Sequence, residues 1–179
     1  MVRACGIAHA VIDLSPAHEL LYEQVLRAFG PEAWGEEAAR LADGNTRARL
    51  RMTALYAVAN LTGRMVVGTD NAAEWYTGYF TKYGDGGVDA VPLVHLTKGE
   101  VRELARFLGV PERVITKAPS AGLWAGQTDE GEMGITYDAI DRYLRGLEVS
   151  EREERAIETL HRNTEHKRRL AAAPPKFER

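Results

Sequence analysis

The sequence predicts an α/β fold with a parallel sheet, and three observations carry this prediction. Short apolar runs that fit strands alternate along the chain with segments of helical hydrophobic spacing. Capping residues or glycines stand at most of the helical boundaries. The 179 residues, 45% of them hydrophobic, suffice for one domain with a sizeable core. We therefore expect a single domain over residues 1–170, followed by a tail over 171–179.

Residues 1–68 contain two expected strands with helices between them. Residues 7–14 are rich in β-branched side chains and predict a buried strand. Apolar side chains at helical spacing then predict a helix over 15–29, a weaker helix over 36–42, and a third that begins near residue 45 and stops at Gly63. Residues 64–68 are short and apolar throughout, which is typical of a strand buried on both faces.

The remainder alternates helices with loops and contains one further strand candidate, residues 91–96. Amphipathic spacing and capping residues predict four helices here, and two glycine-rich stretches predict loops that the chain needs between them. The expected helices are 72–76, 98–108, 137–147 and a charged helix from residue 150 into the HKRRL segment, and the expected loops are 77–89 and 118–133.

Composition limits the class of partner and the compartment. Twenty-three Lys and Arg against 26 Asp and Glu give a net charge of −3, which argues against a surface that coats nucleic acid or membranes. The one cysteine, Cys5, cannot form an intrachain disulfide, so a reducing compartment is expected. No apolar run approaches the roughly 18 residues of a membrane span, and the start does not fit a secretory signal. We therefore expect a cytoplasmic protein without nucleic-acid or membrane partners.

A hydroxyl and two carboxylates follow the strand candidate 64–68. Thr69, Asp70 and Glu74 would lie outside the carboxyl end of a buried strand, where open α/β sheets bind ligands. One helical turn separates Asp70 from Glu74, so both carboxylates can share a side. The alternative is structural: Thr69 and Asp70 would cap a helix, and Glu74 would be an acid favoured by the helix dipole.

Basic residues form the other candidate groups, and each has a structural alternative. Lys82 lies in the glycine-rich TKYGDGG segment, which can be a tight turn rather than a phosphate site. Arg49 and Arg51 diverge by roughly 200° on a helix and fit a solvated face, as does the run His166–Arg169. The sequence contains no nucleophile elbow, CxxC pair or serine triad, so covalent catalysis is not indicated. Dispersed Lys, Arg, Thr and acidic groups instead suit nucleotides and Mg²⁺.

Four long segments of the sequence carry a resemblance to a known family: GNTRARLRM from Gly44, GTDNAAEWYTGYFTKYGDGGVDAVPL from Gly68, LTKGEVRELA from Leu96, and KAPSAGLWAGQTDEGEMGITYDAID from Lys117. Together they closely resemble the ammonia-dependent NAD synthetases, which belong to the N-type ATP pyrophosphatases. The resemblance implies a Rossmann-like parallel sheet with flanking helices, of the adenine nucleotide alpha hydrolase-like type. It also implies ATP-dependent amidation of deamido-NAD with ammonia, through an acyl-adenylate, to give NAD, AMP and pyrophosphate.

The resemblance also implies site residues, a metal ion and a homodimer with the dinucleotide site at its interface. It assigns ATP contacts to Thr69, Lys98 and Ser120, a Mg²⁺ ligand to Glu74, and deamido-NAD contacts to Arg49, Lys82, Asp89, His166 and Lys167. Lysine at the first position of a helix opposes the helix dipole, which an anion docked there would explain. Asp129 and Glu130 belong to a loop that closes over the site in this family, and no residue is assigned a catalytic role.

One departure from the family pattern limits what the resemblance implies. These enzymes carry an SGGxDS phosphate loop, which this sequence lacks, and its VIDL segment at residues 11–14 matches a later strand. We therefore expect a chain truncated at its N-terminus. The alternative of a different class is a catalytically inert module that binds nucleotide or dimerises. A relative of GMP or asparagine synthetases is a weaker alternative.

Overall fold

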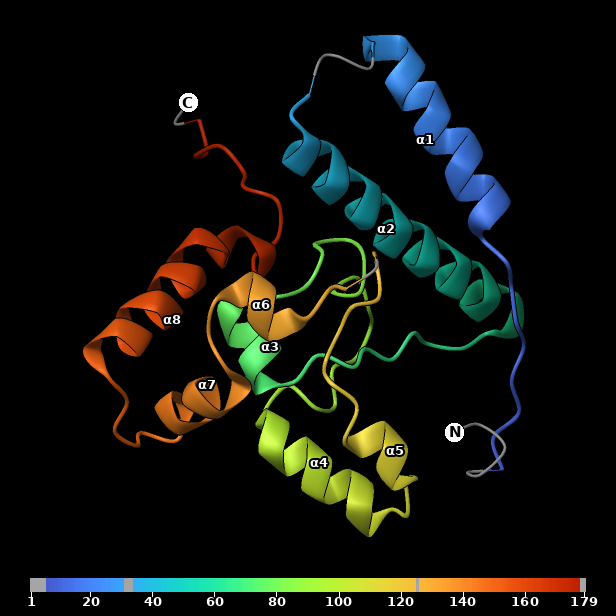
Figure 1. The fold of residues 1–179 in the computed structure, drawn as a ribbon. Helices are drawn as coiled ribbons and strands as arrows, with labels where there is room; N and C mark the ends of the chain where they lie inside the picture. Colours follow the sequence, from blue (N-terminus) through green and yellow to red (C-terminus); the bar gives the residue numbers. More distant parts are fainter. Residues whose placement is uncertain (1–5, 31–33, 125, 178–179) are drawn as a thin grey trace.

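The computed structural model describes residues 6–30, 34–124 and 126–177, and these ranges hold eight α-helices and a short 3₁₀ helix. Two long helices, α1 (Ser15–Phe29) and α2 (Glu36–Thr62), lie along each other in opposite directions (Figure 1). The shorter helices gather beyond α2: α3 (Ala72–Thr77), α4 (Lys98–Phe107), α5 (Glu112–Ile115), α6 (Asp129–Met133), α7 (Tyr137–Leu144), α8 (Glu151–Asn163) and the 3₁₀ helix η1 (Glu165–Lys167).

The hydrophobic core lies where α3, α7 and α8 meet. Ile140 of α7 and Ile157 of α8 are completely buried, as is Ala73 of α3, and Tyr137 is 1% exposed. Complete burial of one isoleucine side chain contributes roughly 1.5–3 kcal/mol. The predicted apolar face of α7 is confirmed, because Tyr143 and Leu144 pack against the same cluster. This core fixes the positions of α3 and α7, the two helices that carry the site described below.

The predicted parallel sheet is reduced to one bridge in the part of the chain that the structure describes. Val67 and Ala90 form an isolated parallel bridge, in which the Gly68 amide donates to the Ala90 carbonyl at 2.8 Å and the Asp89 amide to the Val66 carbonyl at 2.9 Å. Val66 is buried, but Val67 is 57% exposed. The expectation that residues 64–68 are buried on both faces is therefore wrong, since within the described ranges the segment is bridged on one side only, by Ala90.

Two of the expected strands are not strands in this structure. Residues 7–14 form neither helix nor strand and are mostly exposed, with Val11 88% accessible, and they join no described ladder. Residues 91–96 form turns, in which the Val94 amide donates to the Val91 carbonyl and the Leu96 amide to the Leu93 carbonyl. A strand needs hydrogen bonds to a neighbouring strand. Apolar sequence alone did not provide that neighbour.

The helix predictions are mostly confirmed, with one merger. The helix over 15–29 is present, and Gly63 ends α2 in the left-handed conformation with φ 62°. The expected break at Asp43–Gly44 is wrong, because α2 continues through it. A Cβ on Gly44 would lie 3.1 Å from both Leu123 and Trp124, so this glycine permits close packing of another segment on the helix.

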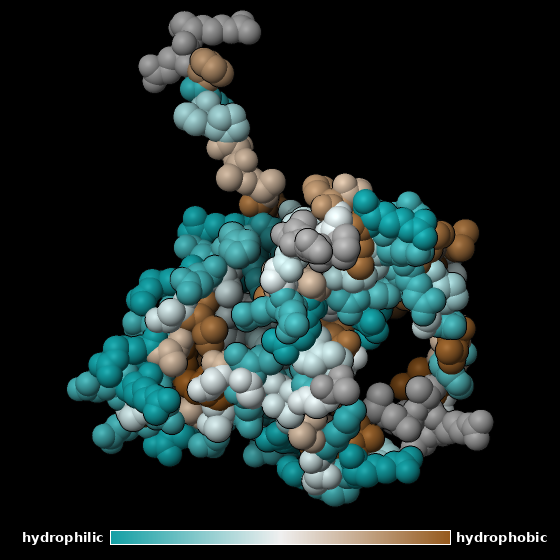
Figure 2. Space-filling model, turned by 45° about the horizontal axis from the view of Figure 1, so that its top comes forward, coloured by the Kyte–Doolittle hydropathy of each residue, from teal (hydrophilic) through white to brown (hydrophobic). Residues whose placement is uncertain are grey.

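The later boundaries differ from the prediction by a few residues. The expected loop 118–133 contains α6, α7 ends at Leu144, and the charged helix ends at Asn163 before η1. Residues 171–177 of the expected tail form neither helix nor strand and are exposed, and its residues 178–179 lie outside the described residues. Apolar side chains reach the surface in several places (Figure 2), among them Phe107 at 86% exposure. None of the described helices is both long and apolar enough to cross a membrane.

Candidate functional site

The N-terminus of α3 is closed by a reciprocal capping box. Asn71 Oδ1 accepts hydrogen bonds from the amides of Ala73 at 3.0 Å and Glu74 at 3.1 Å, and Glu74 Oε2 accepts from the Asn71 amide at 2.9 Å. The cap is thus Asn71, and not Thr69 or Asp70 as the structural alternative proposed. Such a box satisfies amides that the first helical turn leaves without partners.

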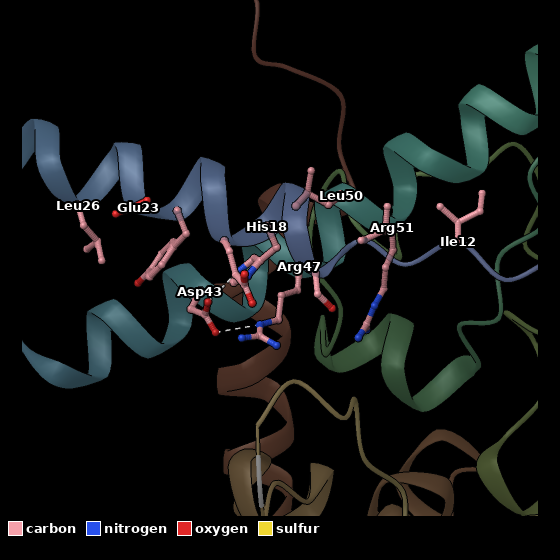
Figure 3. Close-up of a pocket in the computed structure, with 12 residues that line it drawn as sticks. Ile12, His18, Glu23, Leu26, Asp43, Arg47, Leu50 and Arg51 are labelled. Atoms are coloured by element: carbon pink, nitrogen blue, oxygen red, sulfur yellow. Dashed lines mark hydrogen bonds and ion pairs between the residues drawn. The ribbon is translucent and has the colours of Figure 1, made fainter.

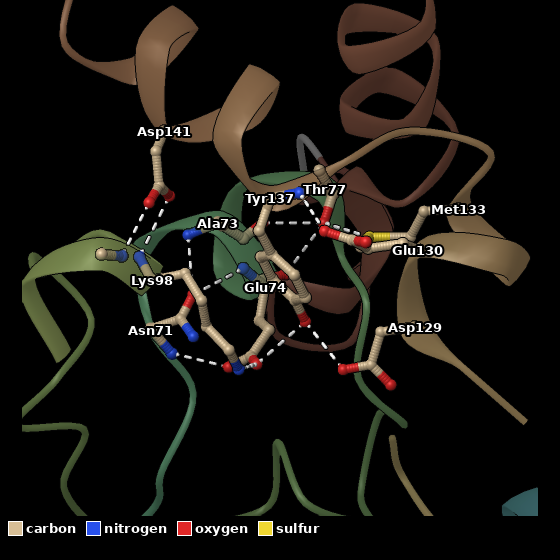
Figure 4. Close-up of polar contacts among 11 residues, drawn as sticks. Asn71, Ala73, Glu74, Thr77, Lys98, Asp129, Glu130, Met133, Tyr137 and Asp141 are labelled. Atoms are coloured by element: carbon tan, nitrogen blue, oxygen red, sulfur yellow. Dashed lines mark hydrogen bonds and ion pairs between the residues drawn. The ribbon is translucent and has the colours of Figure 1, made fainter. Parts of the chain in front are cut away.

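The other oxygen of Glu74 lies at the centre of a charged cluster (Figure 4). Glu74 Oε1 lies 2.8 Å from Lys98 Nζ and 3.1 Å from the Tyr137 hydroxyl, which donates to it. Side chains of the pair are 14% exposed for Glu74 and 19% for Lys98. The Lys98 ammonium also lies 4.5 Å from the centre of the Tyr137 ring. The structure therefore joins the expected metal ligand to one of the expected ATP residues.

The N-terminus of α4 already has an anion of the protein itself. Asp141 of α7 accepts from the Lys98 amide at 3.0 Å and from the Gly99 amide at 2.8 Å (Figure 4). Thr97 and Glu100 form a second capping box at the same terminus. In this structure the anion expected at this helix end is thus Asp141. The first amides of α4 are therefore occupied, and the group that can contact a phosphate is the Lys98 side chain.

Four expected site residues line one cavity of about 480 Å³. Thr69, Lys98 and Ser120, the expected ATP residues, share it with Glu74. Asp70 also lines it, is 5% exposed, and has one carboxylate oxygen, Oδ2, without a hydrogen-bond partner. Burial, with the nearby carboxylates of Asp85 and Glu74, raises the pKa of Asp70 to about 7, and Lys98 opposes the shift.

This donor set fits a cation that is shared with a substrate, and not a dedicated metal cage. Among the described residues no three His, Cys, Asp or Glu side chains are grouped to hold a metal ion. Both oxygens of Glu74 already accept hydrogen bonds, whereas Asp70 Oδ2 has no such partner. Mg²⁺ is usually held by one or two carboxylates together with substrate phosphates and water. Glu74 and Asp70 can supply that share of the ligands.

A second group of expected residues gathers around the loop after α3. Lys82 Nζ donates to the carbonyls of His166 and Arg169, and Arg49 Nε donates to the Lys82 carbonyl at 3.3 Å. Lys167 Nζ donates to two carbonyls of the same loop, at 2.8 and 2.7 Å. Burial lowers the pKa of Lys167. Four of the five expected deamido-NAD residues are thus brought together.

Asp89 is the fifth, and its contacts are elsewhere. Its Oδ1 accepts from the Tyr56 hydroxyl at 3.0 Å and its Oδ2 from the Val66 amide at 2.7 Å. These bonds tie the bridged segment to α2. No described hydrogen bond or ion pair joins Asp89 to the other four.

The first cavity adjoins another of about 460 Å³, which lies between α2, the loop after α3 and the segment before α6. Thr69, Tyr79 and Asp85 line both cavities, and Lys167 lines the second. Two ligands bound in these cavities would therefore meet near Thr69. This is the arrangement that a reaction between two substrates needs.

A chain of hydrogen bonds holds the segment before α6 against the loop after α3. The Tyr79 hydroxyl donates to Glu132 Oε2 at 2.5 Å, Gln127 Nε2 donates to the same oxygen at 2.8 Å, and the Leu123 amide donates to Gln127 Oε1 at 2.8 Å. Burial and the neighbouring carboxylates raise the pKa of the Tyr79 hydroxyl. Glu130 accepts from the Tyr137 amide at 2.9 Å, which ties α6 to α7.

A third cavity, about 710 Å³ in volume, lies between α1 and α2 (Figure 3). Its polar wall is His18, 9% exposed, with Nε2 2.7 Å from Asp43 Oδ1, and Arg47 pairs with the same aspartate. None of the expected site residues lines it. The largest of these cavities is thus separate from the charged cluster.

Sequence reasoning overlooked Tyr137 and Asp141, which contact Glu74 and Lys98. A signal was present, because these two polar residues are four apart and therefore share one face of α7. Asn71 and Glu74 are three residues apart at the start of α3, and that spacing is the signature of a capping box. It could have identified Asn71 as the cap.

Comparison with known proteins agrees with this geometry. The family model described as NAD synthase matches residues 1–171. The NH(3)-dependent NAD(+) synthetases of Alkaliphilus metalliredigens and Alkaliphilus oremlandii are 51% and 53% identical to this chain over 96% of its length, which is 70% and 69% of theirs.

Solved structures give the same result. An NMN synthetase from Francisella tularensis superposes with a TM-score of 0.87 at 46% identity, covering 97% of this chain and 69% of that one. The NAD+ synthetase of Burkholderia pseudomallei superposes with a TM-score of 0.69 at 39% identity, covering 88% of this chain and 58% of that one. This chain belongs to the NAD synthase family.

Proposed function

We propose that the protein is an ammonia-dependent NAD synthetase, a ligase that converts deamido-NAD, ATP and ammonia into NAD, AMP and pyrophosphate. The observation that carries the proposal is the cavity that Thr69, Lys98, Ser120 and Glu74 line together, with a second cavity adjoining it at Thr69. Membership of the NAD synthase family and the curated relatives support the same reaction.

The reaction has two steps, because a free carboxylate resists attack by ammonia. The nicotinate carboxylate attacks the α-phosphorus of ATP, an acyl-adenylate forms, and pyrophosphate leaves. Ammonia then attacks the acyl carbon, AMP leaves with the electrons of the broken C–O bond, and the nitrogen releases one proton to water. Charge accumulates on phosphate in the first step, so cationic groups at that place stabilise the transition state.

In this proposal ATP occupies the cavity of about 480 Å³. Thr69 and Ser120 donate hydroxyl hydrogen bonds, and the Lys98 ammonium exchanges Glu74 for a phosphate oxygen. Glu74 and Asp70 would hold Mg²⁺, which would supply charge neutralisation for the phosphates. The short distance between Glu74 and Lys98 supports this exchange, because the Lys98 ammonium already lies beside an anionic oxygen in this cavity.

Deamido-NAD occupies the adjoining cavity in this proposal. Lys167 lines that cavity, and Arg49, Lys82 and His166 are joined by hydrogen bonds at the loop after α3, which forms one of its walls. Asp89 would act indirectly, through the bridged segment that it holds. A homodimer would place this site at the subunit interface.

We also propose that residues 64–68 and 88–90 belong to the parallel sheet of a Rossmann-like fold, which the parallel bridge at Val67 supports. The domain would cover residues 1–170. A cytoplasmic location is consistent with a reaction that consumes ATP.

The experiment is a stoichiometric assay of the purified chain with ATP, Mg²⁺, ammonium and deamido-NAD. We expect NAD, AMP and pyrophosphate in equal amounts, and no product when ammonium is omitted. If ATP and deamido-NAD bind in calorimetry but no NAD forms, the alternative of an inert binding module is correct and the proposed reaction is wrong.

A second substrate has one observation in its favour, the similarity to the Francisella tularensis NMN synthetase. Amidation of nicotinate mononucleotide would follow the same chemistry, because the reacting carboxylate is the same. The two substrates differ by an adenylate half, so a competition assay separates them. We expect a higher kcat/KM for deamido-NAD, and a preference for the mononucleotide would reverse the assignment.

A further inference from the structure

Helix α7 contacts the Lys98–Glu74 pair from two positions one turn apart. Tyr137, at its first position, reaches the side chains of the pair, and Asp141 reaches the backbone of Lys98 (Figure 4). We propose that Tyr137 and Asp141 are positioning residues, which set where the Lys98 ammonium and the Glu74 carboxylate lie. This inference rests on the proposed function, in which the pair receives Mg²⁺ and ATP.

Tyr137 touches both members of the pair with different parts of its side chain. Its hydroxyl donates to Glu74 Oε1 over 3.1 Å, and the face of its ring lies 4.5 Å from Lys98 Nζ. The ring is 1% exposed and packed in the core, so it cannot follow the movements of the pair. A cation over an aromatic face is attracted by the ring quadrupole. The ring therefore attracts the Lys98 ammonium both when the ammonium contacts Glu74 and when it contacts a phosphate.

The hydroxyl of Tyr137 has two carboxylate neighbours and one hydrogen to give. Asp129 Oδ2 lies 2.9 Å away, and Glu74 Oε1 lies 3.1 Å away. Asp129 is 5% exposed, and its other oxygen has no hydrogen-bond partner. Asp129 begins α6, so the same hydroxyl links the position of α6 to the charged pair.

Asp141 acts on the backbone of the same lysine. Its two carboxylate oxygens accept from the amides of Lys98 and Gly99, which are the first two residues of α4. A carboxylate at a helix N-terminus is stabilised by the helix dipole as well as by these bonds. The bidentate contact fixes the position of the first residue of α4 relative to α7. It thereby fixes the backbone position from which the Lys98 side chain extends.

If Tyr137 and Asp141 only stabilised the fold, their substitution would weaken the binding of both substrates alike. The experiment therefore compares the binding of two ligands. Tyr137→Phe keeps the ring and removes the hydroxyl, while Asp141→Asn keeps the shape and removes the charge. The matched controls are Tyr143→Phe and Asp138→Asn, which make the same changes on α7 away from the pair. Dissociation constants for Mg·ATP and for deamido-NAD are measured by calorimetry, and the two KM values by the assay above.

We expect Tyr137→Phe and Asp141→Asn to weaken Mg·ATP binding and raise the KM for ATP about tenfold, as expected for loss of one hydrogen bond to a charged group. Deamido-NAD binding should change less than about twofold, and both controls should match the unsubstituted protein. If each variant weakens both ligands equally, or if the controls show the same loss, the positioning role is wrong.

The two proposals fail in different ways. If the unsubstituted chain binds no Mg·ATP, the proposed function is overturned, and the positioning role with it. If the unsubstituted chain binds Mg·ATP and Tyr137→Phe and Asp141→Asn bind it equally well, only the positioning role is overturned. Should one of the two variants fail to fold by circular dichroism, the other still tests the contact of α7 with the pair.

Discussion

The two ends of α3 hold charged residues in opposite ways. At the N-terminal end, Glu74 is bonded to the side chains of Lys98 and Tyr137. At the C-terminal end, Lys167 and Arg168 donate to backbone carbonyls, including those of Gly78 and Tyr76. The helix dipole favours acids at the first end and bases at the second, and this short helix follows that rule.

The difference indicates which expected site residues can change partners. A side chain bonded to another side chain can turn toward a ligand, because both partners have rotamer freedom. A lysine bonded to two carbonyls holds the backbone, and its release leaves buried acceptors without donors. We therefore expect changes at the C-terminal end of α3 to reduce stability and changes at its N-terminal end to reduce ATP binding.

Gly78→Ala should give the largest loss of stability, about 4 kcal/mol of unfolding free energy. Gly78 ends α3 at φ 68°, and an added Cβ would lie 2.2 Å from Thr164 of the segment after α8. Urea unfolding measures the loss. Gly134→Ala is the matched control, because Gly134 ends α6 at φ 67° with nothing within 4 Å of an added Cβ. The control should lose only about 1 kcal/mol, the cost of placing alanine in the left-handed conformation. Equal losses in the two variants would show that the contact with Thr164 does not add to the cost at Gly78.

Lys167→Met should cost about 3 kcal/mol, because it removes two charge-assisted hydrogen bonds and leaves the carbonyls of Gly78 and Phe80 unpaired. The measurement is again urea unfolding. Arg169→Met is the control, since the Arg169 guanidinium pairs with Glu165 at the surface and should contribute less than about 0.5 kcal/mol. A stable Lys167→Met protein that has lost deamido-NAD binding would show that Lys167 is free to bind substrate.

The helices could be predicted from sequence more reliably than the sheet, and the reason is physical. Helical hydrogen bonds and caps are local, so Thr97 and Gly63 fixed boundaries that spacing already indicated. A strand depends on a distant neighbour, and residues 91–96 have none among the described residues. Gly44 was mistaken for a stop because its reason, close packing of Leu123 and Trp124, is a tertiary contact.

The candidate site divides in the same way. The resemblance identified Lys98 and Glu74, and the structure brings them to 2.8 Å. It did not identify Asp141 or Tyr137, whose contacts cross from α7 to other helices. Nor could it indicate that Lys82 and Lys167 are bonded to carbonyls, since the sequence shows a lysine in the same way whether its side chain binds substrate or backbone.

The unfolding free energy should decrease as pH rises through the range in which the Asp70 carboxyl is protonated in the folded protein but ionised in the unfolded chain. Burial raises the pKa of Asp70 to about 7 in the folded protein, against about 3.9 in an unfolded chain. Between these values the folded state holds a proton that the unfolded state has released, so the unfolding free energy decreases with pH and levels off above 7. We expect a loss of about 3 kcal/mol from pH 5 to pH 8 from this group.

Asp70→Asn removes that titration and isolates its contribution. Unfolding in urea at pH 5 and pH 8 should show a smaller decrease in the variant than in the unsubstituted protein. Asp138→Asn, an exposed aspartate of α7, should leave the decrease unchanged. If Asp70→Asn has the same pH dependence as the unsubstituted protein, the carboxyl is ionised in the folded state and another group accounts for the slope.

Glu74→Gln should have the smallest effect on folding and a large effect on ligand binding. Glutamine keeps an oxygen for the capping box but removes the charged hydrogen bond to the Lys98 ammonium, at a cost of about 1.5 kcal/mol. Calorimetry should show Mg·ATP binding at least about tenfold weaker, as expected for loss of a charged partner, with deamido-NAD binding retained. Glu158→Gln, which breaks an exposed pair with Arg162, should change neither. Equal loss of both ligands in Glu74→Gln would mean that the N-terminal end of α3 supports the whole site, and the contrast between the two ends would fail.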